Sequence, residues 1–174
     1  MKAKIILLTI FISINMFALG ITGQKAPSFG VDTWIQTNGK TSLDIDSYKG
    51  KVLYVYGFQA WCPGCHSHGF PTLQKLSKHY KNDGKVAFVA IQTVFEGYTF
   101  NSINAAKDII KKYSLTMPIG HSGSSTKASQ FMQNYRSGGT PWTVIIDKNG
   151  RVRFNDFHAD VNEIIKYMDI LKSE

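Results

Sequence analysis

"KVLYVYGFQAWCPGC", residues 51–65, decides the fold of this chain. Its first part, Lys51 to Phe58, is a β-branched and aromatic run without polar alternation, which is typical of a strand buried on both faces. Two cysteines follow directly, and from Phe70 to Tyr80 apolar side chains recur at helical spacing. The stretch therefore predicts a central strand that runs into a cysteine pair at the start of a helix, with Pro71 expected to kink that helix.

Cys62 and Cys65 are the only cysteines among the 174 residues. A domain held together by structural disulfides would normally use more cysteines, scattered through the chain, so the pair indicates chemistry rather than architecture. The surrounding letters, "WCPGCH", allow three chemistries. They are a redox dithiol, a c-type haem attachment site with His66 as iron ligand, and a metal site that adds His66, His68 or His121 to the two thiols.

The next apolar run, Lys85 to Thr93, predicts a second buried strand, and the strand–helix–strand order implies a parallel pair with a right-handed crossover. Downstream patterns predict a helix over residues 101–113, a short extended piece over 117–119 and a helix over 125–135.

Turn signals predict two β-hairpins. Asn38-Gly39 lies between the extended segments 31–35 and 41–45, and Lys148-Asn149-Gly150 lies between strands expected over 142–147 and 151–157. The chain then ends in a helix for which Asp160 and Glu163 have capping-box spacing.

The first twenty residues have the layout of a secretory signal peptide. Lys2 and Lys4 precede an apolar run from Ile5 to Leu19, and the small residues Ala18 and Gly20 suit cleavage after Gly20. That run is shorter than the roughly 20 residues of a membrane-spanning helix. We therefore expect a signal peptide over 1–20, one domain over 21–174, and a periplasmic or extracellular location, with membrane anchoring as the alternative if the signal stays uncleaved.

The formal net charge is +8, and the basic residues are dispersed. No basic stripe interleaved with aromatic residues marks a nucleic-acid groove, so nucleic acid is not expected as a partner. We expect a monomer.

The order of these motifs resembles the thioredoxin fold and, more narrowly, the exported TlpA/ResA-like thiol-disulfide oxidoreductases. The motifs are "APSF", the hairpin, "GKVLYVYGFQAWCPGC", a helical insertion after "VAFVAIQT", and "GGTPWTVIIDKNGRVRF". The resemblance implies an α/β protein with a central mixed sheet flanked by helices, an N-terminal β-hairpin and a helical insertion. It also implies a cis Thr140-Pro141 bond beside the dithiol, where the Thr140 backbone pairs with an extended substrate.

The chemistry of each cysteine follows from its place on the helix. Cys62 would face free N–H groups and the positive end of the helix dipole, which stabilise a thiolate, so we expect it to be the nucleophile and Cys65 to resolve the mixed disulfide. Pro63 suits the first helical turn, Gly64 is less expected there, and Trp61 would shield the site. No organic cofactor and no metal are needed for this exchange.

Two residues depart from the family pattern. Cytoplasmic thioredoxins have a buried aspartate where this chain has Tyr56, and many TlpA/ResA-like members have an acidic residue where it has His68. The usual proton acceptor is missing, and our hypothesis is that His68 or Glu96 assists deprotonation of Cys65.

The rival interpretations fit less well. A haem would need a distal ligand such as Met117, Met132 or Met168, all expected on core faces or beside a strand, and a macrocycle has little room at a packed helix start. A copper-binding protein that uses the two thiols and a histidine is the alternative function. A peroxiredoxin-like peroxidase is third, because Gln59, Ala60 and Trp61 offer no hydroxyl before Cys62.

His79, His121 and His158 look like ordinary surface or interface histidines. The preferred partners are exported proteins with cysteines and a membrane thiol-disulfide protein that resets the pair. Reductase activity is favoured over oxidase activity, although the sequence does not fix the redox potential.

Overall fold

The computed structural model describes residues 20–40, 43–157 and 159–174. The expected signal peptide, apart from Gly20, and His158 lie outside these residues. Within the described part of the chain, no helix has the length and apolar character needed to cross a membrane.

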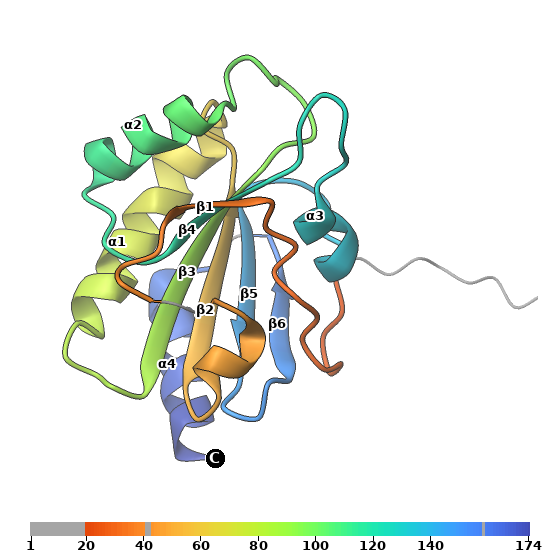
Figure 1. The fold of residues 1–174 in the computed structure, drawn as a ribbon. Coiled ribbons are helices and arrows are strands. Elements are labelled where there is room, and N and C mark those ends of the chain that lie inside the picture. The colour runs from red at the N-terminus through yellow and green to blue at the C-terminus, as the bar shows by residue number, and fades with distance from the viewer. Residues whose placement is uncertain (1–19, 41–42, 158) are drawn as a thin grey trace, which may run out of the picture.

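A six-stranded mixed sheet forms the centre of the fold, in the order β1-β4-β3-β2-β5-β6 (Figure 1). β3 pairs in parallel with β2 and β4, whereas the contacts β1–β4, β2–β5 and β5–β6 are antiparallel. The strands are β1 (Thr33–Gln36), β2 (Val52–Phe58), β3 (Val86–Thr93), β4 (Ile119–Ser122), β5 (Trp142–Ile146) and β6 (Val152–Asp156). The predicted buried strands and C-terminal hairpin are therefore confirmed.

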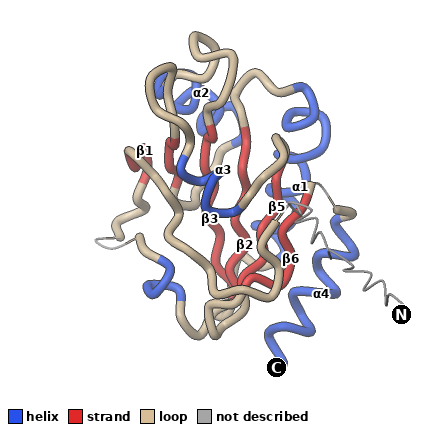
Figure 2. Tube along the Cα trace, turned by 90° about the vertical axis from the view of Figure 1, so that its right-hand side faces the viewer, coloured by secondary structure: helices blue, strands red, loops and turns tan. Residues whose placement is uncertain are grey.

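Helices cover both faces of the sheet, and alternate residues of β2 face opposite layers. Tyr54, Tyr56 and Phe58 pack in one core with α1 (Phe70–His79) and α4 (Val161–Ser173), which lie on the same side of the sheet in Figure 2. Leu53 and Val55 pack in the second core, with α3 (Gln130–Tyr135) and the segment before β1. The remaining helix, α2 (Ile103–Tyr113), is the predicted insertion.

The predicted N-terminal hairpin does not form among the described residues, which leave out residues 41 and 42 of its expected second arm. β1 pairs with β4, more than eighty residues later, and Ile45–Tyr48 is a 3₁₀ helix whose first turn is capped by the Asp44 carboxylate. The Asn38-Gly39 turn does form, with positive φ angles of 54° and 74°. Pairing with the free edge of the sheet and local capping by Asp44 outweigh the turn signal.

Two other boundaries differ from the predictions. The extended piece begins two residues later, as β4, and the helix expected over 125–135 shortens to α3 because the Ser129 hydroxyl caps its start. The final helix begins where expected, with the Asp160 carboxylate accepting from the N–H groups of Asn162 and Glu163.

The helix that follows the cysteines is distorted before Pro71. Residues Cys65–Gly69 form a π turn that leads directly into α1, and the Phe70 N–H donates to the Cys65 carbonyl five residues back. A π turn inside a helix is uncommon and occurs frequently at functional sites. Here the expected distortion lies one turn earlier than Pro71 itself, beside the second cysteine.

The segment before β1 also borders the opposite edge of the sheet. Backbone hydrogen bonds join Gly23 and Gln24 to Val152 of β6, and Ala26 to Gly150. One continuous segment, residues 23–36, therefore contacts β6 at its start and pairs with β4 at its end.

Candidate active site

The cysteine pair lies where β2 ends and the first helix of the domain begins, at the upper end of the sheet in Figure 1. Both cysteines are in the thiol form and buried, Cys62 with 7% of its surface exposed and Cys65 with none. Cys62 acts as the helix cap: its Sγ accepts from the Cys65 N–H at 3.3 Å, and its carbonyl accepts from the His66 N–H. The first cysteine therefore lies at the positive end of a helix, as expected from the sequence.

The Thr140–Pro141 peptide bond is cis, as the resemblance implied, and it borders the pair. Cys62 Sγ lies 3.5 Å from the Thr140 carbonyl oxygen, to which the thiol donates. A Cβ on Gly64 would lie 3.3 Å from Pro141 Cδ, which explains the glycine that the sequence left unexplained: the helix backbone approaches the proline closely at this point.

Cys65 is held in its thiol form more firmly than an exposed cysteine would be. Burial, and then its hydrogen bond with the Cys62 sulfur, raise the pKa of Cys65 to about 12, although the Gln59 N–H and the Tyr56 hydroxyl oppose this shift. A buried, protonated thiol is unreactive until its proton leaves. Deprotonation of Cys65 would therefore be helped by groups around it.

The two acid/base candidates from the sequence lie at the surface. His68 is exposed on the π turn, with its Nδ1 bonded to Ser67 Oγ at 2.7 Å, and Glu96 is exposed in the loop after β3. Cys65, in contrast, is fully buried. Participation of either residue in catalysis stays a prediction.

His66 is engaged in the scaffold. One ring nitrogen lies 2.7 Å from the Ala60 carbonyl oxygen and the other 2.7 Å from the Tyr113 hydroxyl. Because a carbonyl only accepts, Nε2 carries the proton and Nδ1 accepts from Tyr113. The imidazole thus joins the cysteine-bearing helix to α2, and neither nitrogen is available to an iron or copper ion without breaking a hydrogen bond.

The most distant histidine of the metal interpretation in the sequence is held by another strand. His121 is on β4, with Nδ1 3.2 Å from Gln92 Nε2. In the part of the chain that the structure describes, no group of three or more His, Cys, Asp or Glu residues is placed to hold a metal ion.

Three polar residues that the sequence analysis did not single out hold the loops around the pair. Buried Asn101 accepts from the Ala60 N–H at 2.8 Å and donates to the carbonyls of Glu96 and Gly97. Gln59 is likewise buried; it accepts from the Thr140 hydroxyl and donates to the Glu96 carbonyl. Tyr113 is the third of these residues, because its hydroxyl forms the hydrogen bond with His66 described above. Single amides carry no sequence pattern that would have revealed these contacts.

Exposed aromatic side chains surround this end of the sheet. Trp61 is 45% exposed, and its indole lies against the backbone of Gly97, where a Cβ would be 3.1 Å from Nε1. Next to the cis-proline loop, exposed Phe157 packs edge-on against Trp142, which is the residue after Pro141. The cysteine pair is thus bordered by apolar surface.

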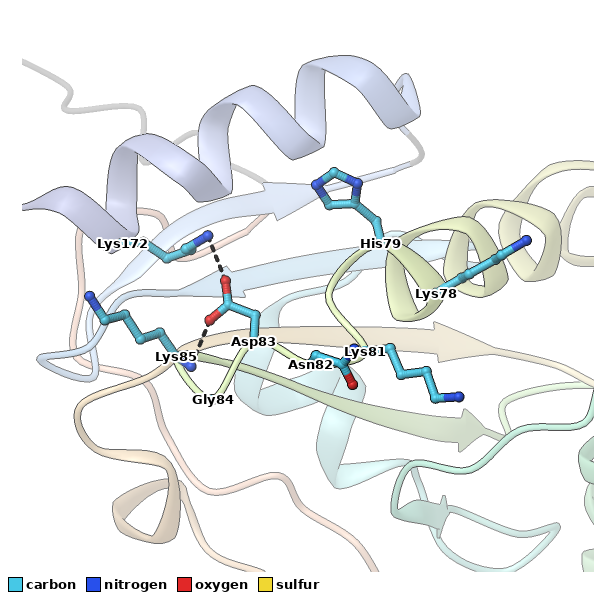
Figure 3. Close-up of a pocket in the computed structure, with 8 residues that line it drawn as sticks. All are labelled: Lys78, His79, Lys81, Asn82, Asp83, Gly84, Lys85 and Lys172. Carbon is cyan, nitrogen blue, oxygen red and sulfur yellow. Dashed lines mark hydrogen bonds and ion pairs between the residues drawn. The ribbon is translucent and has the colours of Figure 1, made fainter.

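A hollow lined by Lys78, His79, Lys81, Asp83, Lys85 and Lys172 lies around the start of β3 (Figure 3). It measures about 620 Å³ and lies between the end of α1, the start of β3 and the end of α4. Its lining is mostly basic, but Lys172 is already paired with Asp83 and Asp169. Because β2 and β3 are parallel, the start of β3 lies at the opposite end of the sheet from the end of β2, where the cysteines follow. The hollow is therefore separate from the cysteine pair.

A strand that leads into a helix-capping Cys-x-x-Cys, faced by a cis-proline loop, defines a thioredoxin-fold protein with a dithiol site. The chain belongs to the Redoxin family, whose sequence profile matches residues 21–169. The resemblance to TlpA/ResA-like proteins is confirmed by curated relatives. The thiol-disulfide oxidoreductase ResA of Bacillus cereus is 27% identical over 132 residues, which cover 75% of this chain and 66% of that protein. The match thus spans just under two thirds of the relative's length.

Solved structures agree with this assignment. A thioredoxin-like superfamily protein is 30% identical with a TM-score of 0.78, over 86% of this chain and 97% of its own. A thiol-disulfide isomerase from Corynebacterium glutamicum is 28% identical with a TM-score of 0.76, over the same shares of 86% and 97%. The thioredoxin fold predicted from the sequence is confirmed.

Proposed function

We propose that the protein is an exported thiol-disulfide oxidoreductase that exchanges a disulfide with cysteine-containing proteins through Cys62 and Cys65. The observation that carries the proposal is the place of Cys62 Sγ, at a helix start and 3.5 Å from the carbonyl of the cis-proline loop. The names of its relatives, which are thiol-disulfide oxidoreductases and an isomerase, support the same chemistry.

In the reducing direction, the Cys62 thiolate attacks a substrate disulfide. A bond forms between Cys62 and one substrate sulfur, and the other substrate sulfur leaves as a thiolate that takes a proton from water. Cys65 then attacks Cys62 Sγ, which forms the Cys62–Cys65 disulfide, and its proton passes to the departing second sulfur. The substrate gains two electrons and two protons, the protein loses them, and no organic cofactor or metal is required.

Substrate docking is assigned to the residues that border the pair. The Thr140 backbone, held by the cis bond beside Cys62, would pair with an extended segment on either side of the substrate cysteine. Gly64 and Pro63 leave the approach to Cys62 free of large side chains, and Trp61 covers the neighbouring surface.

We further propose that the protein works outside the cytoplasm, as a reductase reset by a membrane thiol-disulfide protein. The signal-peptide pattern of residues 1–20 supports export, and the names of the curated relatives support the family's redox chemistry. Expression of the full chain followed by cell fractionation tests the location, and equilibration in glutathione or dithiothreitol buffers gives the reduction potential. A value near that of DsbA would overturn the reductase assignment.

Reduction of insulin by the protein in dithiothreitol tests the exchange itself. The wild-type protein is expected to accelerate precipitation of the insulin chains, and Cys62→Ser to give only the background rate. Cys65→Ser should instead accumulate a mixed disulfide at Cys62, visible by mass spectrometry. Lys75→Ala, on the exposed side of α1, is the matched control and should act as wild type. Equal rates for wild type and Cys62→Ser would overturn the proposal.

A further inference from the structure

Tyr56 is a buried polar residue beside the dithiol for which the proposed exchange has so far given no role. It lies in the middle of β2 with 1% of its surface exposed, and its ring packs against Phe58 and Phe70. Within the described residues, its hydroxyl has no hydrogen-bond partner. Leaving a buried hydroxyl unpaired costs stability, so its presence here calls for a physical reason.

The hydroxyl points at the π turn that carries Cys65. A Cβ on Gly69 would lie only 1.8 Å from Tyr56 Oη, so the missing side chain of that glycine makes the space in which the hydroxyl lies. Gly69 ends the same five-residue turn that Cys65 begins, and Tyr56 and Cys65 belong to one buried cluster. Burial, and then the neighbouring Cys65 sulfur, raise the pKa of Tyr56. The uncommon turn, the glycine and the tyrosine therefore meet at the resolving cysteine.

The strength of this interaction depends on the charge of Cys65. A thiol sulfur is a weak acceptor, which agrees with a hydroxyl that has no hydrogen-bond partner when Cys65 is a thiol. A thiolate is a charged acceptor, and hydrogen bonds to charged groups are shorter and stronger. The hydroxyl is thus poorly satisfied while Cys65 is protonated and becomes satisfied when negative charge develops on its sulfur.

We propose that Tyr56 is a catalytic hydrogen-bond donor that stabilises the thiolate formed when Cys65 loses its proton, the species that then attacks the mixed disulfide. The inference rests on the exchange proposed above and specifies its second step. Tyr56 keeps its proton throughout, because burial and then the neighbouring Cys65 sulfur raise its pKa well above the ordinary value. It acts as a fixed donor aimed at the place where charge appears, and does not replace the proton acceptor of other family members.

A test separates the two steps by using an aromatic disulfide that releases a coloured thiolate at each step. The reduced full-length protein is mixed with 5,5′-dithiobis(2-nitrobenzoate) and followed by stopped flow, with mass spectrometry of acid-quenched samples. Tyr56→Phe should release the first thiolate at the wild-type rate and the second about tenfold or more slowly, the usual worth of a hydrogen bond to a charged group. A mixed disulfide at Cys62 should accumulate meanwhile, and the pH profile of the second release should move to higher pH.

Tyr54→Phe is the matched control. Tyr54 lies two residues earlier on the same face of β2, equally buried, but its hydroxyl lies 3.3 Å from Thr143 Oγ1. This variant should show both phases at wild-type rates. Urea unfolding should find Tyr56→Phe at least as stable as wild type, since it removes an unpaired hydroxyl, and Tyr54→Phe less stable.

The outcomes distinguish the inference from the function. If the wild-type protein releases both thiolates and Tyr56→Phe releases them at the same two rates, the role of Tyr56 is overturned. The proposed exchange would still stand. Equal slowing of the second release in Tyr56→Phe and Tyr54→Phe would also overturn the role of Tyr56, because it would reveal a general effect on packing. A wild-type protein that releases neither thiolate would overturn the exchange, and the role of Tyr56 with it.

Discussion

Replacement of Asn101 by alanine should loosen the loop that borders the cysteine pair and destabilise the whole domain. The Asn101 side chain makes three hydrogen bonds to backbone groups: it accepts from the Ala60 N–H at 2.8 Å and donates to the Glu96 and Gly97 carbonyls at 2.9 and 3.3 Å. Asn101 is 1% exposed, so alanine would remove these three bonds and leave the Ala60 N–H without its partner.

The size of the effect follows from which groups water can reach. The Glu96 carbonyl still accepts from the Gln59 side chain and the Gly97 carbonyl from the Phe100 N–H, and exposed Glu96 is open to water. The Ala60 N–H directly follows the buried Gln59 and loses its partner. One buried group left unpaired, together with two modest bonds exchanged for water, costs about 2 to 4 kcal/mol. At a typical slope for a domain of this size, the urea midpoint should fall by about 1 to 2 M.

The assay is urea unfolding of the reduced protein followed by circular dichroism, which does not depend on the local environment of Trp61. Asn104→Ala is the control, because Asn104 is an exposed asparagine on α2, and its free energy of unfolding should stay within about 0.5 kcal/mol of wild type. A loss below about 1 kcal/mol for Asn101→Ala, or equal losses for the two variants, would refute the reasoning from buried hydrogen bonds.

Two further predictions concern packing and pH. Gly57→Ala should destabilise the domain by about 1 to 3 kcal/mol in urea unfolding, because its Cβ would lie 2.8 Å from an atom of the Phe131 ring. Gly84→Ala, which meets nothing within 4 Å, should be near neutral, and similar losses for both would contradict the steric argument. Burial lowers the pKa of His121 despite the opposing charge of Asp32, so the unfolded chain binds a proton more readily. The free energy of unfolding should therefore decline as pH falls below about 6.5. His121→Gln should reduce this decline between pH 7.5 and 5.5; identical pH profiles would count against it.

Much of the fold was predictable because its signals are local. The runs of β2 and β3 are continuously apolar, and the strands β5 and β6 flank a strong turn, so few alternatives compete. The N-terminal hairpin failed for the opposite reason. Thr33 pairs with His121, and nothing in the neighbourhood of Thr33 indicates that the free edge of β4 will be available.

In the candidate site, too, some features were expected before the structure and others were not. The place of Cys62 at the helix start follows from a short motif, the cis form of Thr140-Pro141 was implied by the resemblance, and the structure contains both. Tyr56 was noticed only as a departure from the family, because a sequence does not show that its hydroxyl is unpaired and directed at Gly69. Contacts between single polar groups from distant segments are set by the packed tertiary structure.

The segment of residues 23–36 has a consequence for self-association. A sheet with open edges offers unpaired N–H and C=O groups to any other strand, including one from a second copy of the same chain. Here one segment occupies a stretch of β6 and the outer side of β4, and β1 is itself only four residues long with a register shift between Trp34 and Gln36. A chain shortened to begin after Gln36 would keep the cysteine pair, but it would present both edges as templates for strand exchange. We expect such a chain to aggregate at concentrations at which the full protein stays dispersed.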